Sequence, residues 1–326
     1  MTSDGTRRPG TGGTPADGTS TDAPATPPPP GLPAPPPPGA SALPPGTFDG
    51  TVVLVTGGGS GLGLAIAAEF ARLGADLVIA GRSATRLTAA REELAALGGR
   101  VATAVCDIRD PDRVTAAFDA AESAYGLPAV LVNSAAANFP VPAEEMSPNA
   151  WRAVLDTTLT GTFFMTRAFA RRHLAAGTPG SVINIGASYA WTGGPGFAHS
   201  AAAKAGVRSL VETLAVEWGP YGIQVNGLVP GLMPHEDMTR DIRAALTGTD
   251  TPAAASSLAR RQPALRVGAP RELGWAATFL ASPYARFITG HTLVVDGANW
   301  QRRSLVNPPV VPLREQLGRD RHPPAR

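Results

Sequence analysis

Residues 51–82 read TVVLVTGGGSGLGLAIAAEFARLGADLVIAGR, and this stretch decides the fold. A short β-branched run is followed by a glycine-rich turn, a helix-forming segment and a second apolar run. Glycines between a strand and a helix allow a tight turn and let the backbone approach a pyrophosphate, whose charge meets the helix N-terminus. The pattern therefore predicts a strand–turn–helix–strand unit that binds a dinucleotide.

The same alternation continues along the chain. Further strands are expected at residues 100–108, 129–133, 182–185, 223–228 and 291–297, and helices at 83–98, 112–125, 148–176, around Lys204 and at 271–280. Strands that alternate with helices imply a parallel sheet covered on both faces. We expect one α/β domain over residues 47–300, a single Rossmann-type doubly wound sheet.

Composition limits the protein classes that fit. The chain has 326 residues, of which 43% are hydrophobic, enough for a substantial core. One cysteine, Cys106, excludes an intrachain disulfide framework and fits a reducing compartment. No run of eighteen apolar residues and no signal-peptide pattern is present, so we expect no membrane span and a cytoplasmic location.

Three segments stand apart from this domain. Residues 1–46 are rich in proline and glycine and predict a disordered or polyproline II tail. Residues 301–326 form a basic tail with six Arg against one Glu and one Asp, which leaves the middle of the chain near neutral and without a nucleic-acid face. Residues 232–266 follow a strand's carboxyl end, where they are either a substrate lid or an ordinary surface insertion.

The ends of the predicted strands supply the candidate cofactor residues. Arg82 and Ser83 stand where an acidic residue would hold the ribose hydroxyls of NAD, so they favour the 2′-phosphate of NADPH. Arg86 is a weaker second candidate, and a solvated surface charge is the alternative for Arg82. The remaining candidates lie at the other strand ends and in the glycine turn: Thr56, Gly57, Ser60, Gly61, Leu62, Gly63, Asp107 (for the adenine amino group), Asn133, Pro230 and Gly231. Asp107 and Asn133 could instead be local turn formers.

A second stretch, SVINIGASYAWTGGPGFAHSAAAKAG (residues 181–206), together with the TGGGSGLG turn, resembles the short-chain dehydrogenase/reductase family. Most members carry a catalytic tyrosine four residues before the lysine that corresponds to Lys204. Here that position holds Ser200, Ala187 takes the usual serine site and Thr158 the usual asparagine site. The nearest upstream tyrosine is Tyr189.

This displacement is similar to the 2,4-dienoyl-CoA reductase branch, as are NSAAANF, EMSPNAW, HSAAAKAG and LAVEWGPYGI. The resemblance implies that Tyr189, Asn138, Ser200 and Lys204 are the catalytic residues. It implies NADP(H) as cofactor, an acyl-CoA substrate, hydride addition to the distal carbon of a conjugated dienoyl thioester, and protonation at the α-carbon to give a 3-enoyl-CoA. It also implies a homo-oligomer, a homotetramer in the family.

Two alternatives stay open: a reductase of another carbonyl or activated alkene with Tyr189 as acid, and an inactive nucleotide-binding member of the family.

CoA phosphates could meet Arg260, Arg261, Arg302 or Arg303, but a solvated charge run is the simpler reading of the tail. His199 adjoins Ser200, yet neighbours on a helix point in different directions, so we do not expect it to be the base. His235 and Asp237 lie in the insertion, where they could contact substrate or nothing. No metal site is expected from the scattered histidines and single cysteine.

Overall fold

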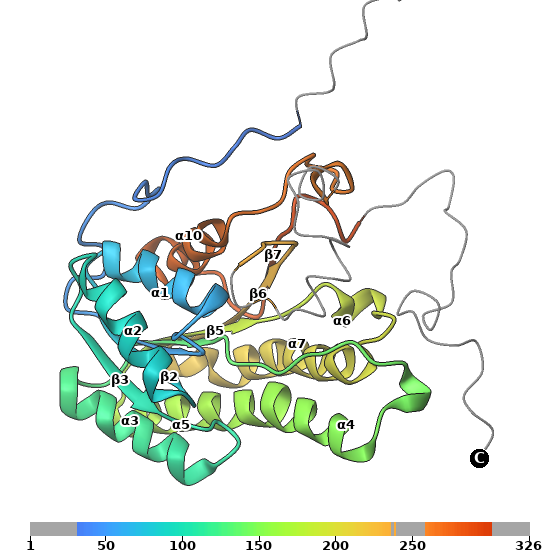
Figure 1. The fold of residues 1–326 in the computed structure, drawn as a ribbon. Coiled ribbons are helices and arrows are strands. Elements are labelled where there is room, and N and C mark those ends of the chain that lie inside the picture. Colours follow the sequence, from blue (N-terminus) through green and yellow to red (C-terminus); the bar gives the residue numbers. More distant parts are fainter. Residues whose placement is uncertain (1–30, 236–237, 239–257, 302–326) are drawn as a thin grey trace, which may run out of the picture. The chain divides into compact units, whose positions relative to one another are not determined.

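The computed structural model describes residues 31–235, 238 and 258–301. Seven strands form one sheet in the order β3-β2-β1-β4-β5-β6-β7, with every neighbouring pair parallel (Figure 1). The predicted Rossmann-type doubly wound sheet is thereby confirmed. The strands are β1 (Val52–Thr56), β2 (Asp76–Gly81), β3 (Val101–Val105), β4 (Val130–Asn133), β5 (Gly180–Ile185), β6 (Ile223–Pro230) and β7 (Thr292–Val295).

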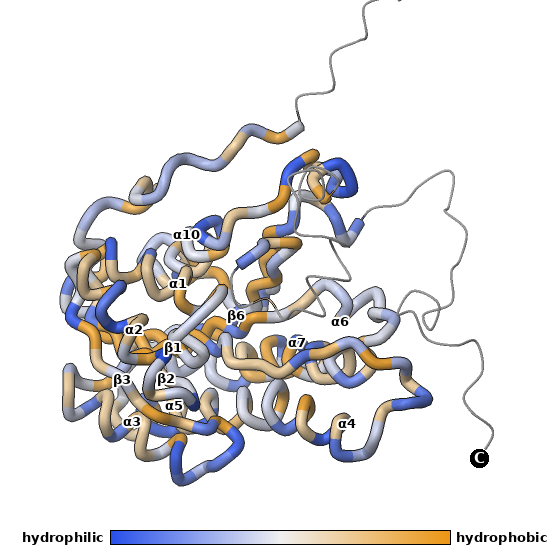
Figure 2. The backbone as a smooth tube through the Cα atoms, viewed as in Figure 1, coloured by the Kyte–Doolittle hydropathy of each residue, from blue (hydrophilic) through white to orange (hydrophobic). Residues whose placement is uncertain are grey.

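Helices cover both faces of this sheet because successive strand residues point to opposite sides. Val53 and Val55 belong to a core shared with the helices α1 and α10, whereas Leu54 joins a core shared with α3, α5 and α7. Hydrophobic residues concentrate along the strands in Figure 2. None of the helices in the described part of the chain is long and apolar enough to cross a membrane. The helices are α1 (Gly61–Arg72), α2 (Ala84–Ala95), α3 (Pro111–Tyr125), α4 (Pro148–Leu155), α5 (Gly161–Ala176), α6 (Tyr189–Thr192), α7 (Ala198–Trp218) and α10 (Pro270–Ala281).

The strand order reverses between β1 and β4, and this reversal fixes where a ligand can bind. From β1 the chain runs outward through β2 to β3, then returns to place β4 on the other side of β1. The crossover helices diverge at that point, which opens a crevice beyond the carboxyl ends of the strands. Thr56 of β1 and Asn133 of β4 are paired in register at the edge of this crevice.

The long helix expected over residues 148–176 is interrupted. One π-helical turn, η2 (Asp156–Thr160), separates α4 from α5. Two threonines bond back to the helix backbone around it: Thr157 Oγ1 donates to Ala153 O at 2.8 Å and Thr162 Oγ1 to Thr158 O at 2.8 Å. Such side-chain bonds compete with the helix ladder, and π turns occur often at functional sites.

Residues 31–46, which we name the N-terminal strap, contain neither helix nor strand, as a polyproline-rich segment predicts, but hydrogen bonds attach them to the domain. Leu32 N donates to Ala264 O at 2.9 Å, and Arg271 Nε of α10 donates to Pro36 O at 3.0 Å. Leu43 packs against the hydrophobic core. Proline carbonyls are good acceptors in an extended chain without a ladder of its own, and here the domain supplies the donors. Residues 1–30 of the predicted tail lie outside the described residues.

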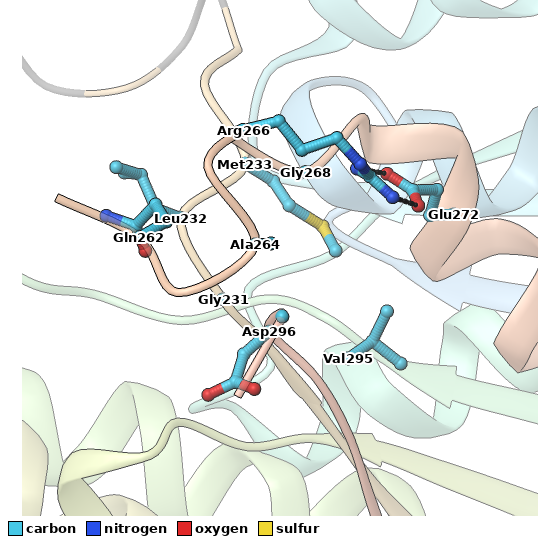
Figure 3. A pocket seen from close by; sticks show the side chains of 11 residues that line it. Gly231, Leu232, Met233, Gln262, Ala264, Arg266, Gly268, Glu272, Val295 and Asp296 are labelled. Atoms are coloured by element: carbon cyan, nitrogen blue, oxygen red, sulfur yellow. Dashed lines mark hydrogen bonds and ion pairs between the residues drawn. The ribbon is translucent and has the colours of Figure 1, made fainter. Parts of the chain in front are cut away.

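The two ends of the 232–266 insertion are held together, although most of its middle lies outside the described residues. Gly268 N donates to Leu232 O at 2.9 Å, and Arg266 makes a two-pronged ion pair with Glu272 at 2.7 and 2.8 Å. Figure 3 shows this pair beside a cavity that Met233 also lines. With a volume of about 40 Å³, this cavity is large enough only for water.

Candidate active site

A cleft of about 780 Å³ lies at the carboxyl ends of the central strands. Its lining comes from the turns after β1, β2, β4, β5 and β6 together with α7, so the whole central sheet contributes to it. A volume of this size suits a cofactor-sized molecule. The predicted site residues that line it are Gly57, Ser60, Gly61, Leu62, Gly63, Arg82, Ser83, Asn138, Tyr189, Lys204, Pro230 and Gly231.

The glycine turn fits a pyrophosphate. Gly57 has a φ of +68°, and a Cβ there would lie 3.0 Å from Ala135 N. A Cβ on Gly63 would lie 2.3 Å from Gly57 O, a distance that no side chain tolerates. Ser60 precedes α1 without a capping bond from its side chain, and the first helical turn has no acidic residue. The helix N-terminus is thus free of competing anions, as binding of a phosphate requires.

Basic residues mark one end of the cleft. Arg82 and Ser83 follow β2 and line the cleft, and Arg86 lines it one turn into α2. The Ser83 hydroxyl also caps α2 by accepting from Arg86 N at 3.4 Å. Asp107 does not line the cleft: it receives two-pronged hydrogen bonds from Arg109, which lower the pKa of its carboxyl to about 2. Binding of an adenine amino group by Asp107 therefore stays a prediction.

Two other predicted cofactor residues, Thr56 and Asn133, do not line the cleft but hold together the elements that form it. Thr56 Oγ1 accepts from Ser134 N at 3.1 Å and from Ala135 N at 3.2 Å, which joins β1 to the turn after β4. The Asn133 amide, only 3% exposed, donates to Asn184 Oδ1 and Thr166 Oγ1, both at 2.9 Å. Their side chains hold neighbouring elements at the correct spacing, and neither is in the lining.

Three of the four predicted catalytic residues, Tyr189, Asn138 and Ser200, are joined by hydrogen bonds, and Tyr189 and Asn138 line the cleft. Tyr189, the first residue of α6, shares a 2.9 Å hydrogen bond between its hydroxyl and Ser200 Oγ of α7. Asn138 Nδ2, from the loop after β4, donates to the same hydroxyl at 3.3 Å. The Tyr189 ring stacks on Phe197, with ring planes 5° apart. Residues far apart in the sequence thus converge on one phenol.

Burial sets the proton affinity of this phenol. Removal from water disfavours the charged phenolate, so the pKa of Tyr189 lies above its ordinary value, an effect that the hydrogen bond with Ser200 partly offsets. At neutral pH Tyr189 is a neutral proton and hydrogen-bond donor. Asn138 Oδ1 is buried and has no hydrogen-bond partner among the described residues, so this oxygen can still accept a hydrogen bond.

Lys204 stands on α7 one turn beyond Ser200 and is the only lysine of the chain. Its ammonium donates to the carbonyl of Ile185 at the end of β5, and the side chain is 8% exposed. Burial lowers the pKa of this ammonium to about 8. Lys204 is therefore mostly cationic near neutrality, beside the strand ends that line the cleft.

Sequence reasoning missed how the Asn138 loop is held. Thr158, in the π turn, donates to Ala137 O at 3.3 Å and accepts from Ala137 N at 3.2 Å. Val141 N donates to Gly196 O at 2.9 Å. The unusual threonine in LDTTLTG was the available signal, but its partner is not readable from local sequence. Cleft-lining residues outside the predictions include Cys106, Ile108, Ala135, Thr157 and Met238. His235, for which the sequence leaves a substrate contact open, also lines the cleft.

Comparison with known proteins identifies the family of this chain. A family model described as enoyl-(acyl carrier protein) reductase matches residues 57–298. A "probable 2,4-dienoyl-CoA reductase [(2E)-enoyl-CoA-producing]" of Bacillus subtilis is 38% identical over 249 residues, which cover 76% of this chain and 96% of that protein. A gluconate 5-dehydrogenase of Gluconobacter oxydans is 36% identical, over 77% of this chain and 95% of that protein.

Among solved structures, a short-chain dehydrogenase from Bacillus anthracis superposes with a TM-score of 0.69 at 37% identity. The match covers 77% of this chain and 96% of that chain. Most of the sequence outside the match is therefore present only in this chain. The chain belongs to the short-chain dehydrogenase/reductase family, whose members bind a nicotinamide cofactor, and it resembles the 2,4-dienoyl-CoA reductase branch.

Proposed function

We propose that this oxidoreductase is an NADPH-dependent 2,4-dienoyl-CoA reductase of fatty-acid breakdown. The observation that carries the proposal is the Tyr189 hydroxyl held between Asn138 Nδ2 and Ser200 Oγ at 3.3 and 2.9 Å. A tyrosine displaced from the usual position beside Lys204 still reaches the catalytic end of the cleft. An acyl-CoA substrate and a homo-oligomeric enzyme belong to the same proposal, which the similarity to a dienoyl-CoA reductase supports.

The residues suit a reduction in which negative charge develops on a thioester oxygen. The glycine turn and Arg82 would hold NADPH, which when bound would supply a hydride for the distal carbon of the diene. Asn138 Nδ2 and the Tyr189 hydroxyl are adjacent donors for the oxygen on which charge accumulates, and donors aimed at that charge are usually the largest catalytic contribution. Because its pKa is raised by burial, Tyr189 retains its proton near neutrality.

The hydride carries two electrons and one hydrogen to the diene. One proton then supplies the second hydrogen and completes the reduction. Protonation at the α-carbon gives a 3-enoyl-CoA, the product that the family resemblance implies. Protonation at the γ-carbon gives a 2-enoyl-CoA, the product in the printed name of the Bacillus subtilis relative. Both outcomes share the hydride step and the same oxygen donors. The position of Tyr189 relative to the bound chain would decide between them.

Arg82 supports NADPH as the cofactor. It lines the cleft directly after β2, where the ribose of an adenine nucleotide would lie above the glycine turn. A guanidinium matches the two-pronged geometry of a phosphate. Among the lining residues the cleft has no acidic side chain at this end, and the nearby Asp107 carboxylate is paired with Arg109.

The test is the loss of NADPH absorbance with a short 2,4-dienoyl-CoA, with NADH and a simple ketone as parallel assays. We expect turnover with NADPH and the dienoyl thioester, and a fall in kcat of about 10²–10³-fold in Tyr189→Phe. Tyr221→Phe is the control, since Tyr221 is 62% exposed and lies outside the lining of the cleft. Preferential reduction of the ketone would favour a carbonyl reductase instead. Cofactor binding without turnover of any substrate would favour an inactive member of the family.

The cofactor preference is tested by Arg82→Ala. Loss of a charged hydrogen-bond donor to phosphate costs about 1.5–3 kcal/mol, so the Kd for NADPH should rise by about 10- to 100-fold. The Kd for NADH, which has no 2′-phosphate, should change little. Arg91→Ala on the exposed surface of α2 is the matched control. Equal losses for both cofactors would contradict the assignment of the phosphate to Arg82.

A further inference from the structure

His199, which the sequence sets beside Ser200 without a role, is fully buried at the first turn of α7. Its Nδ1 accepts a hydrogen bond from Ser200 N at 2.7 Å. The first N–H groups of a helix have no partner within the helix, and here the histidine supplies one. Since Nδ1 accepts, the neutral ring carries its proton on Nε2. Burial also lowers the pKa of His199, which keeps the ring neutral.

The other contact of His199 reaches the loop that carries Asn138. The His199 and Phe139 rings pack edge to face, with centroids 4.7 Å apart and ring planes at 82°. Phe139 follows Asn138 directly in the sequence, so the ring contact restrains the backbone that aims the Asn138 amide.

We infer that His199 is a positioning residue that holds Ser200 and Asn138 in place. These two side chains are the hydrogen-bond partners of the Tyr189 hydroxyl. The contacts form a closed circuit, from Asn138 to Tyr189, to Ser200, to His199, to Phe139 and back along the chain to Asn138. The inference rests on the proposed function, because it assigns His199 to the site that would reduce the diene.

A purely space-filling role does not explain a histidine at this position. Its Nε2 is buried and has no partner among the described residues. A buried donor without a partner costs stability, and a leucine or phenylalanine would fill the same volume without that cost. A serine or asparagine could accept from the helix N-terminus, but neither carries a ring to pack against Phe139. Histidine combines the acceptor with the ring.

The decisive variants separate the acceptor from the ring. His199→Phe keeps an aromatic ring and loses the acceptor, and His199→Asn keeps an acceptor near the position of Nδ1. Misplacement of a catalytic group by about 1 Å can cost about 100-fold in rate. We expect kcat to fall 10- to 100-fold in His199→Phe with the Kd for NADPH unchanged. In His199→Asn, which keeps the acceptor but loses the ring contact with Phe139, we expect a clearly smaller fall of kcat.

A double-mutant cycle shows whether the effect passes through the serine. In a Ser200→Ala background, His199→Phe should cause less than a threefold further loss of kcat, because the group that it positions is absent. An undiminished loss in that background would overturn the inference. So would an equal fall of kcat in the phenylalanine and asparagine variants, or a fall of kcat matched by weaker NADPH binding.

Amide hydrogen exchange keeps the inference testable if the proposed function fails. In full-length protein with NADPH, exchange at Ser200 N–H is followed by mass spectrometry of peptides that span residues 197–204. Faster exchange in His199→Phe than in both wild type and His199→Asn supports the inference even if the wild type reduces no dienoyl-CoA. Equal exchange in all three proteins overturns it, whatever the substrate proves to be.

Discussion

At the scale of single residues, Lys204 combines burial with charge. Its side chain is 8% exposed, its ammonium bonds the Ile185 carbonyl, and its pKa is lowered to about 8. Isolated buried cations are tolerated only at a cost in stability, and perturbed pKa values of this kind cluster at functional sites. Lys204 lines the cleft, and under the proposed function its charge would interact with the cofactor ribose and with the charge that develops in the reaction.

The lowered pKa of Lys204 predicts how stability depends on pH. Between about pH 8 and 10.5 the unfolded chain holds a proton that folded Lys204 has lost, so the stability contributed by this group rises with pH across that window. Below pH 8 the full cost of the buried ammonium, about 3 kcal/mol, is present. Without cofactor, Lys204→Met should be more stable than wild type at pH 7, and this difference should shrink towards pH 10.5, as urea denaturation would measure.

The pKa itself can be measured directly because Lys204 is the only lysine. Protein labelled with ¹³C at the lysine Cε gives one lysine signal, whose titration midpoint should lie near pH 8. A midpoint near 10.5 would mean that the ammonium is solvated, and the predicted stability window would vanish with it.

At the scale of elements, the strap and the insertion show what local sequence patterns omit. Proline-rich sequence does predict the absence of helix and sheet in residues 31–46, and the structure has neither there. The bonds that hold the strap join Pro36 to Arg271, more than 200 positions apart, and no period in the sequence encodes such a pair. The strap lies outside the 57–298 match to the family model.

Truncation tests whether the strap stabilises the domain. Deletion of residues 1–42 removes the bonds of Leu32 and Pro36 to Ala264 and Arg271. At about 0.5–1.5 kcal/mol for each hydrogen bond, we expect Tm to fall by several degrees in differential scanning fluorimetry. Deletion of residues 1–30 is the matched control, because it removes none of the contacts that the structure describes. Identical Tm values for the two truncated proteins would show that the strap contributes nothing measurable.

The candidate site was partly predictable for the same physical reasons. Carboxyl ends of parallel strands meet at one edge, so the turn residues Gly57 and Arg82 could be placed in the cleft from sequence alone. The convergence of Tyr189, Asn138 and Ser200 followed from family resemblance rather than from spacing. Thr56, Asn133 and Asp107 stand at strand ends as expected, but their side chains bond protein neighbours. Whether such a side chain binds a ligand or a protein neighbour can be decided only from the three-dimensional structure.

At the scale of the whole molecule, the cleft draws on both halves of the sheet. Its lining begins at Gly57 after β1 and includes Lys204 of α7 and Pro230 at the end of β6. Strands β1 and β6 belong to one parallel sheet and contribute to both of its hydrophobic cores, and α7 contributes to one of them. A ligand that spans the cleft therefore contacts elements from opposite sides of the strand-order reversal, and its binding energy adds to the stability of the entire domain.

This coupling predicts a cofactor-dependent Tm. A ligand that binds only the folded state at 100 times its Kd stabilises by about 2.7 kcal/mol, which is about 5–10 °C for a domain of this size. At equal concentrations NADPH should raise Tm more than NADH, because only its 2′-phosphate can meet Arg82. In Arg82→Ala the two shifts should become equal, since the variant keeps the glycine turn and Lys204. Equal shifts in the wild type would contradict the preference for NADPH, whereas no shift with either nucleotide would contradict the assignment of the cleft itself.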